Sequence, residues 1–170
     1  MVYDAAGNDI LNIHKDRFHD TSATGELGDP GAGTRARVSF VAAYYDLADR
    51  LTDTVDVGTN DTPLSREWSP DNNTGTANMV QVAAFVYDNG GVGDSNLTQM
   101  TLFPGNGAEP RVTQFFVDWR DRTVASKSGV QAVEATDLNR PIFYTEFDNL
   151  GQAIAQEQYG KRKGTRLIYK

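Results

Sequence analysis

The chain contains no cysteine, so it has neither disulfides nor a thiolate site for metal binding or catalysis. No apolar run in its 170 residues approaches the length of a membrane-spanning helix, and no signal-peptide pattern opens it. A Gly-rich phosphate loop with its lysine is missing, as is a Gly-x-Ser-x-Gly nucleophile motif. The sequence therefore predicts a chain that is not an enzyme and has no catalytic residue and no cofactor.

Histidine is scarce, because His14 and His19 are the only two in the chain. Asp16 and Asp20 lie beside them, and histidine with carboxylate is a common metal-ligand set. Their five-residue separation, however, places the histidines on opposite sides of a strand and does not align them on a helix. We expect exposed polar residues that lead into a loop, and no metal site.

The net charge is −7, but the charge is unevenly distributed. The last ten residues contain five basic and no acidic residues, so residues 1–160 carry 11 basic and 23 acidic residues, a net −12. A body of this charge repels nucleic acids and anionic membranes. We therefore expect no nucleic-acid partner, and we interpret the basic end as a solvated terminus.

One short pattern recurs five times along the chain. Each copy has an aromatic or apolar residue followed by Asp, and Gly or Asp three positions after that Asp. The Asp residues are 42, 42, 30 and 30 residues apart, and such spacing is typical of repeat architectures. The copies occupy residues 3–8, 45–50, 87–92, 117–122 and 147–152. Their pattern residues are Tyr3, Asp4, Gly7, Tyr45, Asp46, Asp49, Tyr87, Asp88, Gly91, Val117, Asp118, Asp121, Phe147, Asp148 and Gly151.

The pattern matches the requirements of a tight turn between antiparallel strands. A type I turn favours Asp in its first position and Gly in its fourth, and the Asp side chain accepts a hydrogen bond from the backbone. In hairpins the fourth position commonly takes a left-handed conformation, which Gly adopts without strain and Asp tolerates. The pattern therefore predicts five hairpins with one shared backbone geometry.

Between the turns, residues with period-two alternation predict strands. Leu51, Asp53, Val55 and Val57 fall on one face of such a segment. Residues 20–37 are rich in Gly, Thr, Asp and Ala, and residues 58–78 contain several Pro, Asn and Gly residues. Both segments predict long loops, with a shorter one at 104–110. We expect an all-β chain in which antiparallel hairpins form a curved sheet or partial shell, with residues 1–170 as a single repeat array.

Two segments also fit helical spacing, namely residues 38–56 and 150–159. The repeat favours strands, because the equivalent positions in other copies hold residues that are poor in helix centres, such as Asn89 and Gly90.

At these turns the chain resembles the RHS/YD-repeat family, whose name comes from a Tyr-Asp pair. Three copies match that pair literally, and those that begin at Val117 and Phe147 are variants. Arg50 and Arg122 follow the turn where that family often carries Arg. The resemblance implies β-hairpins wound into a large extracellular or cell-surface shell, as in bacterial toxin-encapsulating proteins and the teneurins. The partners it implies are the remaining repeats of a longer chain and an encapsulated toxin domain or a surface glycan.

Two other functions are open alternatives. The first is a carbohydrate- or protein-binding β-module that uses exposed aromatic residues such as Trp68, Trp119 and Tyr144. The second is a carboxylate-based hydrolase, since acidic residues are plentiful. Calcium is a further alternative at Asp88 and Asp94 with their neighbouring asparagines, although turn formation explains that cluster equally well.

Overall fold

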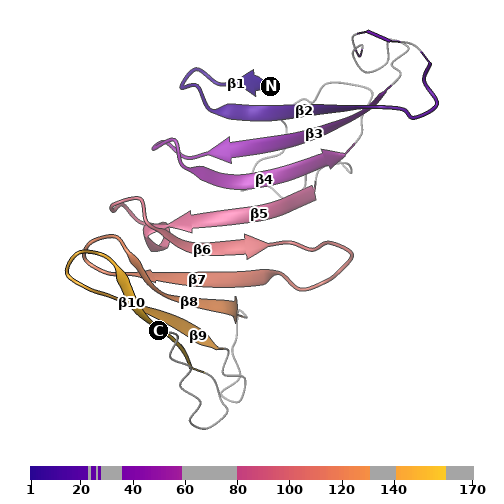
Figure 1. The fold of residues 1–170 in the computed structure, drawn as a ribbon. Helices are drawn as coiled ribbons and strands as arrows, with labels where there is room; N and C mark the ends of the chain where they lie inside the picture. Colours follow the sequence, from indigo (N-terminus) through magenta and orange to yellow (C-terminus); the bar gives the residue numbers. More distant parts are fainter. Residues whose placement is uncertain (23, 26, 28–35, 59–79, 131–140, 160–170) are drawn as a thin grey trace. The chain divides into compact units, whose positions relative to one another are not determined.

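The structure, a computed structural model, describes residues 1–170 except residues 23 and 26 and the ranges 28–35, 59–79, 131–140 and 160–170. It contains ten β-strands and one 3₁₀ turn, η1, and the described residues contain no α-helix (Figure 1). The elements are β1 (Val2–Tyr3), β2 (Asp9–Arg17), β3 (Ala36–Tyr45), β4 (Leu51–Gly58), β5 (Val80–Tyr87), η1 (Asp88–Gly90), β6 (Leu97–Leu102), β7 (Arg111–Val117), β8 (Thr123–Val130), β9 (Ile142–Phe147) and β10 (Ala153–Tyr159).

The strands form one antiparallel sheet in the order of the sequence, from β1 to β10, and the sheet does not close on itself. The prediction of an all-β fold built from antiparallel hairpins is therefore confirmed. The helical alternative is wrong for both segments, because residues 38–56 lie in β3, a turn and β4, and β10 occupies most of 150–159. The predicted turns lie between β1 and β2, β3 and β4, β5 and β6, β7 and β8, and β9 and β10.

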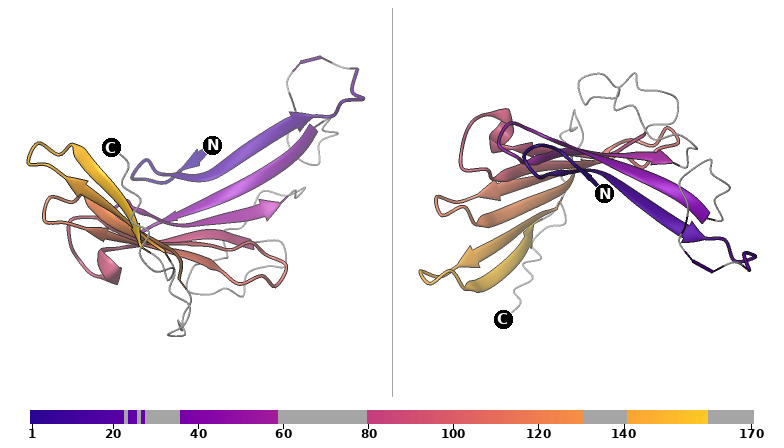
Figure 2. Two further views of the ribbon diagram at one scale, coloured as in Figure 1. Left: turned by 60° about the horizontal axis from the view of Figure 1, so that its bottom comes forward. Right: turned by 90° about the horizontal axis from the view of Figure 1, so that it is seen from above.

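The chain divides within β5 into two compact units, Met1–Ala83 and Ala84–Lys170. The first unit contains the turns that begin at Asp4 and Asp46, and the second contains those that begin at Asp88, Asp118 and Asp148. Two further views show that the two strands joined by each turn lie side by side (Figure 2).

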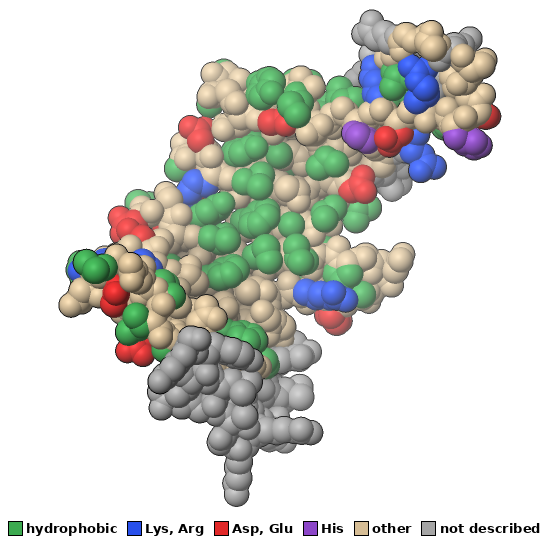
Figure 3. Space-filling model, viewed as in Figure 1, with side chains coloured by type: hydrophobic (Ala, Val, Ile, Leu, Met, Phe, Trp, Pro, Cys, Tyr) green, Lys and Arg blue, Asp and Glu red, His purple; other side chains and the backbone are tan. Residues whose placement is uncertain are grey.

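A packed apolar cluster lies on one face of β2, β3 and β4. Along β3, buried residues alternate with more exposed ones, and Val55 and Val57 on β4 face the same side with 0% exposure. The cluster consists of Leu11, Val38, Phe40, Ala42, Val55 and Val57. Apolar side chains gather over the middle of these strands (Figure 3). The alternation predicted for β4 is thus present, and buried Asp53 on this face accepts a hydrogen bond from Gln81 Nε2 at 2.6 Å.

In the second unit the only described hydrophobic side chain that is buried is that of Ala125. Large apolar and aromatic side chains on its strands are nearly half exposed, including Phe116 at 46%, Phe143 at 45% and Tyr144 at 44%. Among the described residues, the second unit therefore has no large apolar side chain that is fully buried.

The predicted loops agree with the strand ends where the structure describes them. The 104–110 loop lies between β6 and β7, and the 20–37 loop ends earlier than predicted, because β3 begins at Ala36. Of the predicted 58–78 loop, Gly58 belongs to β4 and the rest lies outside the described residues. No helix in the described part of the chain is long and apolar enough to cross a membrane.

Candidate functional site

The repeated aspartate turns are the feature that the chain builds most consistently, and four of the five have the same backbone geometry. We number each turn from its Asp, so that Gly or Asp is the fourth residue. The Asp N–H donates to the carbonyl of the fifth residue at 2.9–3.0 Å, and the fourth N–H donates to the Asp carbonyl at 3.0–3.2 Å. These four turns begin at Asp4, Asp46, Asp118 and Asp148.

In these four turns the Asp carboxylate stabilises the turn by accepting hydrogen bonds from the turn's own backbone. Its Oδ1 accepts hydrogen bonds from the backbone N–H groups of the third and fifth residues, at 2.8–3.1 Å in every copy. Two donors that the strand ladder leaves unpaired are thereby satisfied, which is why Asp is favoured in this position.

The fourth residue of these four turns lies in the left-handed region, as the sequence predicts. Its φ is 96° at Gly7, 58° at Asp49, 59° at Asp121 and 83° at Gly151.

The third turn departs from this geometry. Gly91 has φ −103°, so the prediction that it is left-handed is wrong. Positive φ occurs instead at Asp88, Asn89 and Gly90, and at Ser95 directly before Asn96. Although the Gly91 N–H still donates to the Asp88 carbonyl, the hairpin closes from Asp88 N to Asn96 O at 2.9 Å, eight residues after the Asp instead of four.

Extra residues at 91–94 cause this expansion. The Asp88 carboxylate reaches across them and accepts the N–H groups of Ser95 and Asn96 at 3.1 and 3.0 Å. Gly93 is needed there, since a Cβ at that position would lie 2.8 Å from Asp88 Cγ. Asn96 consequently occupies the place that the fifth residue has in the other turns.

Three turn carboxylates are held in their ionised form. The Arg122 side chain, whose Nη2 lies 2.6 Å from Asp118 Oδ2, lowers the pKa of Asp118 from 3.8 to about 2. At Asp46, burial alone would raise the pKa, but hydrogen bonds from the Arg50 backbone and side chain outweigh it and lower the pKa. Backbone and side-chain hydrogen bonds from Asn8 lower the pKa of Asp4. A general acid at neutral pH needs a raised pKa, so these carboxylates are suited to accept hydrogen bonds and not to donate protons.

Side chains also connect one turn to the next within each unit. Asn8 Nδ2 donates to Asp49 Oδ1 at 2.9 Å, and Asn96 Nδ2 donates to Asp121 Oδ1 at 2.7 Å. Arg122 Nη1 donates to the Asp148 carbonyl at 3.2 Å, and its guanidinium lies 4.8 Å from the centre of the Phe147 ring. Sequence reasoning noted Arg122 but missed the role of Asn8 and Asn96.

The residues before each Asp have no common polar role. The Tyr45 hydroxyl donates to the Asp9 carbonyl at 3.2 Å, and burial, followed by the charges of Asp9 and Asp4, raises its pKa. The Tyr3 ring is 56% exposed, and in two turns Val117 and Phe147 replace tyrosine. A hydroxyl is therefore not a requirement of this position.

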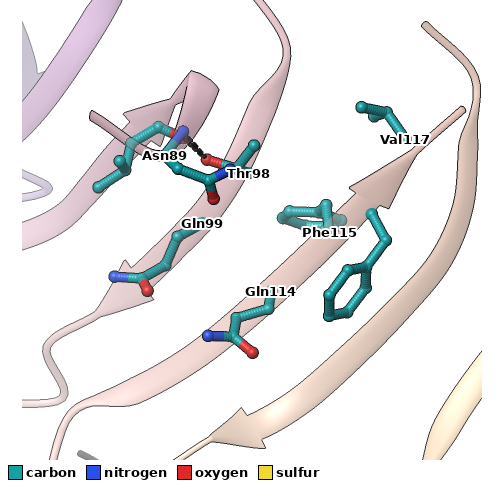
Figure 4. A pocket seen from close by; sticks show the side chains of 8 residues that line it. Asn89, Thr98, Gln99, Gln114, Phe115 and Val117 are labelled. Carbon is teal, nitrogen blue, oxygen red and sulfur yellow. Dashed lines mark hydrogen bonds between the residues drawn. The ribbon is translucent and has the colours of Figure 1, made fainter. Parts of the chain in front are cut away.

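A hollow of about 500 Å³ lies between the third turn, β6 and β7 (Figure 4). Gln99 and Gln114 face each other in register across β6 and β7, and the Phe115 ring lies beside them. Thr98 Oγ1 accepts a hydrogen bond from the Asn89 N–H at 2.9 Å and donates one to the Val86 carbonyl at 3.1 Å. These two bonds hold the third turn against β6 at one end of the hollow.

A second hollow, of about 470 Å³, lies over β9 and β10. Tyr144 and Tyr159 form an edge-to-face pair there, with ring centroids 5.4 Å apart, and Ile142 and Glu157 complete the lining. Of the other aromatic residues predicted to bind ligands, Trp119 is 82% exposed and the Arg120 guanidinium covers its ring at 4.4 Å. Trp68 lies outside the described residues.

His14 and His19 are both exposed, and His14 Nε2 contacts Asp16 Oδ1 at 2.9 Å. The described residues contain no group of three or more His, Cys, Asp or Glu side chains that could hold a metal ion. The two histidines form separate purple patches on the surface (Figure 3).

Comparisons with protein-family models, with curated proteins and with solved structures found no match to this chain.

Proposed function

We propose that the chain is a non-catalytic structural segment of an RHS/YD-repeat protein, whose hairpins build part of a shell. The observation that supports this proposal is the turn-to-turn contact. Within each unit, a side chain next to one aspartate turn donates a hydrogen bond to the following turn. Contacts that join successive hairpins within a unit are suited to an array that extends a sheet.

The chemistry of the turns agrees with a structural role. The lowered pKa values of Asp4, Asp46 and Asp118 keep these groups as hydrogen-bond acceptors over the whole physiological pH range. In the proposed shell, the partners are the neighbouring repeats of a longer chain and an enclosed toxin domain or a surface glycan. The location is the cell exterior or the cell surface.

Cryo-electron microscopy of the protein expressed from its full reading frame tests the proposal. The expected result is a hollow assembly in which residues 1–170 form part of a continuous wall, with further strands paired to this segment. Density that shows residues 1–170 as a separate domain, with no strand added to either edge, would refute the shell.

The Tyr144–Tyr159 pair favours a second candidate function, a carbohydrate-binding module. Aromatic rings beside a carboxylate offer a stacking surface and a hydrogen-bond acceptor, which are the groups that bind a sugar ring. Both rings are about half exposed, at 44% and 50%, and Glu157 lines the same hollow.

A glycan array followed by calorimetry tests this second candidate. Tyr144→Ala is expected to abolish binding of any glycan found, whereas Phe143→Ala is the matched control. Phe143 is 45% exposed on the same strand, and its side chain points to the opposite face. Equal loss in both variants, or no glycan bound by the wild-type chain, would exclude the candidate.

A further inference from the structure

The five turns alternate between two types. In the first, third and fifth turns, the fourth residue is Gly and an amide side chain follows the turn; we call these Gly–amide turns. In the second and fourth turns, Asp is followed by Arg; we call these Asp–Arg turns. The Gly–amide turns contain Gly7 and Asn8, Gly91 and Asn96, and Gly151 and Gln152, and the Asp–Arg turns contain Asp49 and Arg50, and Asp121 and Arg122.

The contact from a Gly–amide turn to the following Asp–Arg turn is the same in both units. The amide of Asn8 reaches the Asp49 carboxylate in the first unit, and the amide of Asn96 reaches Asp121 in the second, at 2.9 and 2.7 Å. Each joins an amide donor to a side-chain carboxyl oxygen of the following turn. The expansion of the third turn does not disturb it, because Asn96 keeps the place of the fifth residue.

The contact from an Asp–Arg turn to the following Gly–amide turn uses different groups. The fourth residue of that turn, Gly151, has no acceptor side chain, and the arginine side chains donate hydrogen bonds to backbone carbonyls instead. Arg122 donates to the Asp148 carbonyl at 3.2 Å and Arg120 to the Asn149 carbonyl at 2.9 Å.

We propose that the structural repeat of this chain is a pair of hairpins with complementary turns, and that the amide–carboxylate contact determines which hairpin follows a Gly–amide turn. The specificity residues are Asn8 with Asp49 and Asn96 with Asp121. A hairpin whose turn has an acceptor side chain in the fourth position fits beside a Gly–amide turn. A hairpin without it removes this acceptor, and Asn8 would then keep only its hydrogen bond to Asp4 Oδ2 at 3.1 Å. The proposal concerns the stacking of hairpins in this chain and does not depend on the shell.

Exchanging the two groups at residues 96 and 121 tests the proposal. Asn96→Asp places two carboxylates against each other, and we expect the melting temperature of the full chain to fall by about 2–4 °C. Asp121→Asn keeps a neutral amide in a left-handed position, which Asn tolerates, and we expect a smaller change. In the double variant Asn96→Asp/Asp121→Asn the donor and acceptor are reversed, and the loss is expected to be recovered.

Gln152→Glu provides the matched control. This substitution makes the same amide-to-carboxylate change in a Gly–amide turn. No described turn follows Gln152, so the variant measures only the repulsion between Glu and Asp148 within one turn. We expect this control to lower the melting temperature less than Asn96→Asp does. In nuclear magnetic resonance spectra, the side-chain amide protons of Asn96 should exchange with water more slowly than those of Gln152. The proposal would be overturned if the effects of Asn96→Asp and Asp121→Asn on the melting temperature were additive in the double variant. It would also be overturned if Asn96→Asp and Gln152→Glu lowered the melting temperature equally.

Discussion

A left-handed residue closes four of the aspartate turns, and Gly and Asp reach this conformation at different cost. Gly has no Cβ, whereas Asp must accept contact between its Cβ and the following carbonyl. Asp49 and Asp121 nevertheless occupy the position, and each accepts a hydrogen bond from the preceding turn in its unit. The contact offsets the strain, so the choice between Gly and Asp depends on the neighbouring hairpin as well as on the turn.

This conformational cost gives a prediction for Gly151. Its φ is 83° and a Cβ would meet nothing within 4 Å, so substitution adds backbone strain without a clash. Gly151→Ala should lower the free energy of unfolding by about 1–2 kcal/mol. The matched control is Gly91→Ala, because Gly91 is extended and an added Cβ would make ordinary contact at 3.4 Å. Denaturant titrations measure both variants, and equal losses would contradict the turn assignment.

A second prediction concerns the pH dependence that Asp118 contributes. Its pKa is lowered from 3.8 to about 2 by the Arg122 side chain. A carboxyl group whose pKa is lower in the folded state contributes stability that is complete above its unfolded pKa and is lost as the pH falls through its folded pKa. Asp118→Asn should therefore be less stable than the wild type at pH 7, and the difference should shrink between about pH 4 and pH 2.

Thermal unfolding of both proteins across this pH range measures the difference. Asp94→Asn is the control, since the Asp94 side chain is exposed and makes no hydrogen bond to the described residues. A gap between wild type and Asp118→Asn that stays constant down to pH 2 would show that Arg122 does not stabilise the ionised carboxylate.

At the scale of elements, the sequence was sufficient to predict the hairpins because turn chemistry and strand alternation agree. Residues 38–56 also have helical spacing, yet Asp46 and Asp49 place a reversal in the middle of that segment. The expanded third turn could not be predicted from the same pattern. Gly91 stands three positions after Asp88 as the template requires, but the residues that follow it allow the hairpin to close later, at Asn96.

The alternation along β3 predicts unequal effects at two adjacent positions. Phe40 is 1% exposed in the apolar cluster, and Val41 is 46% exposed on the other face. Phe40→Ala should lower the free energy of unfolding by about 3–5 kcal/mol, because it opens a cavity. Val41→Ala should cost less than about 1 kcal/mol, the range of strand propensities. Urea titrations that give similar losses would mean that this face of β3 does not pack.

At the scale of the molecule, the two units differ in how they bury apolar surface. The described apolar cluster lies wholly in Met1–Ala83, and the described strands of Ala84–Lys170 retain half-exposed aromatic rings. Sequence reasoning did not foresee this difference, because the burial of a strand's side chains depends on what covers its face as well as on the strand's own residues. It also missed the turn-to-turn contacts. In the third copy the residue after Gly91 is Val92, and only the expanded turn brings Asn96 to the place of the fifth residue, so the sequence pattern alone does not reveal the contact with Asp121.

The outer strands of the sheet lead to the last prediction. Among the described strands β10 pairs only with β9, and β1 covers β2 only at Asp9 and Leu11. Strands at the edge of a sheet tend to recruit other strands, so we expect the isolated 170-residue chain to self-associate. Residues 1–160 carry 11 basic and 23 acidic residues, and their net charge of −12 opposes association until salt screens it.

Light scattering across a salt series should therefore show the average mass rising with ionic strength. The first and last described turns, those of Gly7 and Gly151, are both Gly–amide turns. If two copies stacked end to end, Gln152 of one copy would therefore meet the Gly7 turn of the other, which has no acceptor side chain in its fourth position. Gln152→Ala is accordingly expected to leave association unchanged, and a lysine on the β10 edge, Gln156→Lys, to reduce it. A monomer at every salt concentration would mean that both edges are covered, and a loss of association in Gln152→Ala would mean that unlike turns are not required for stacking.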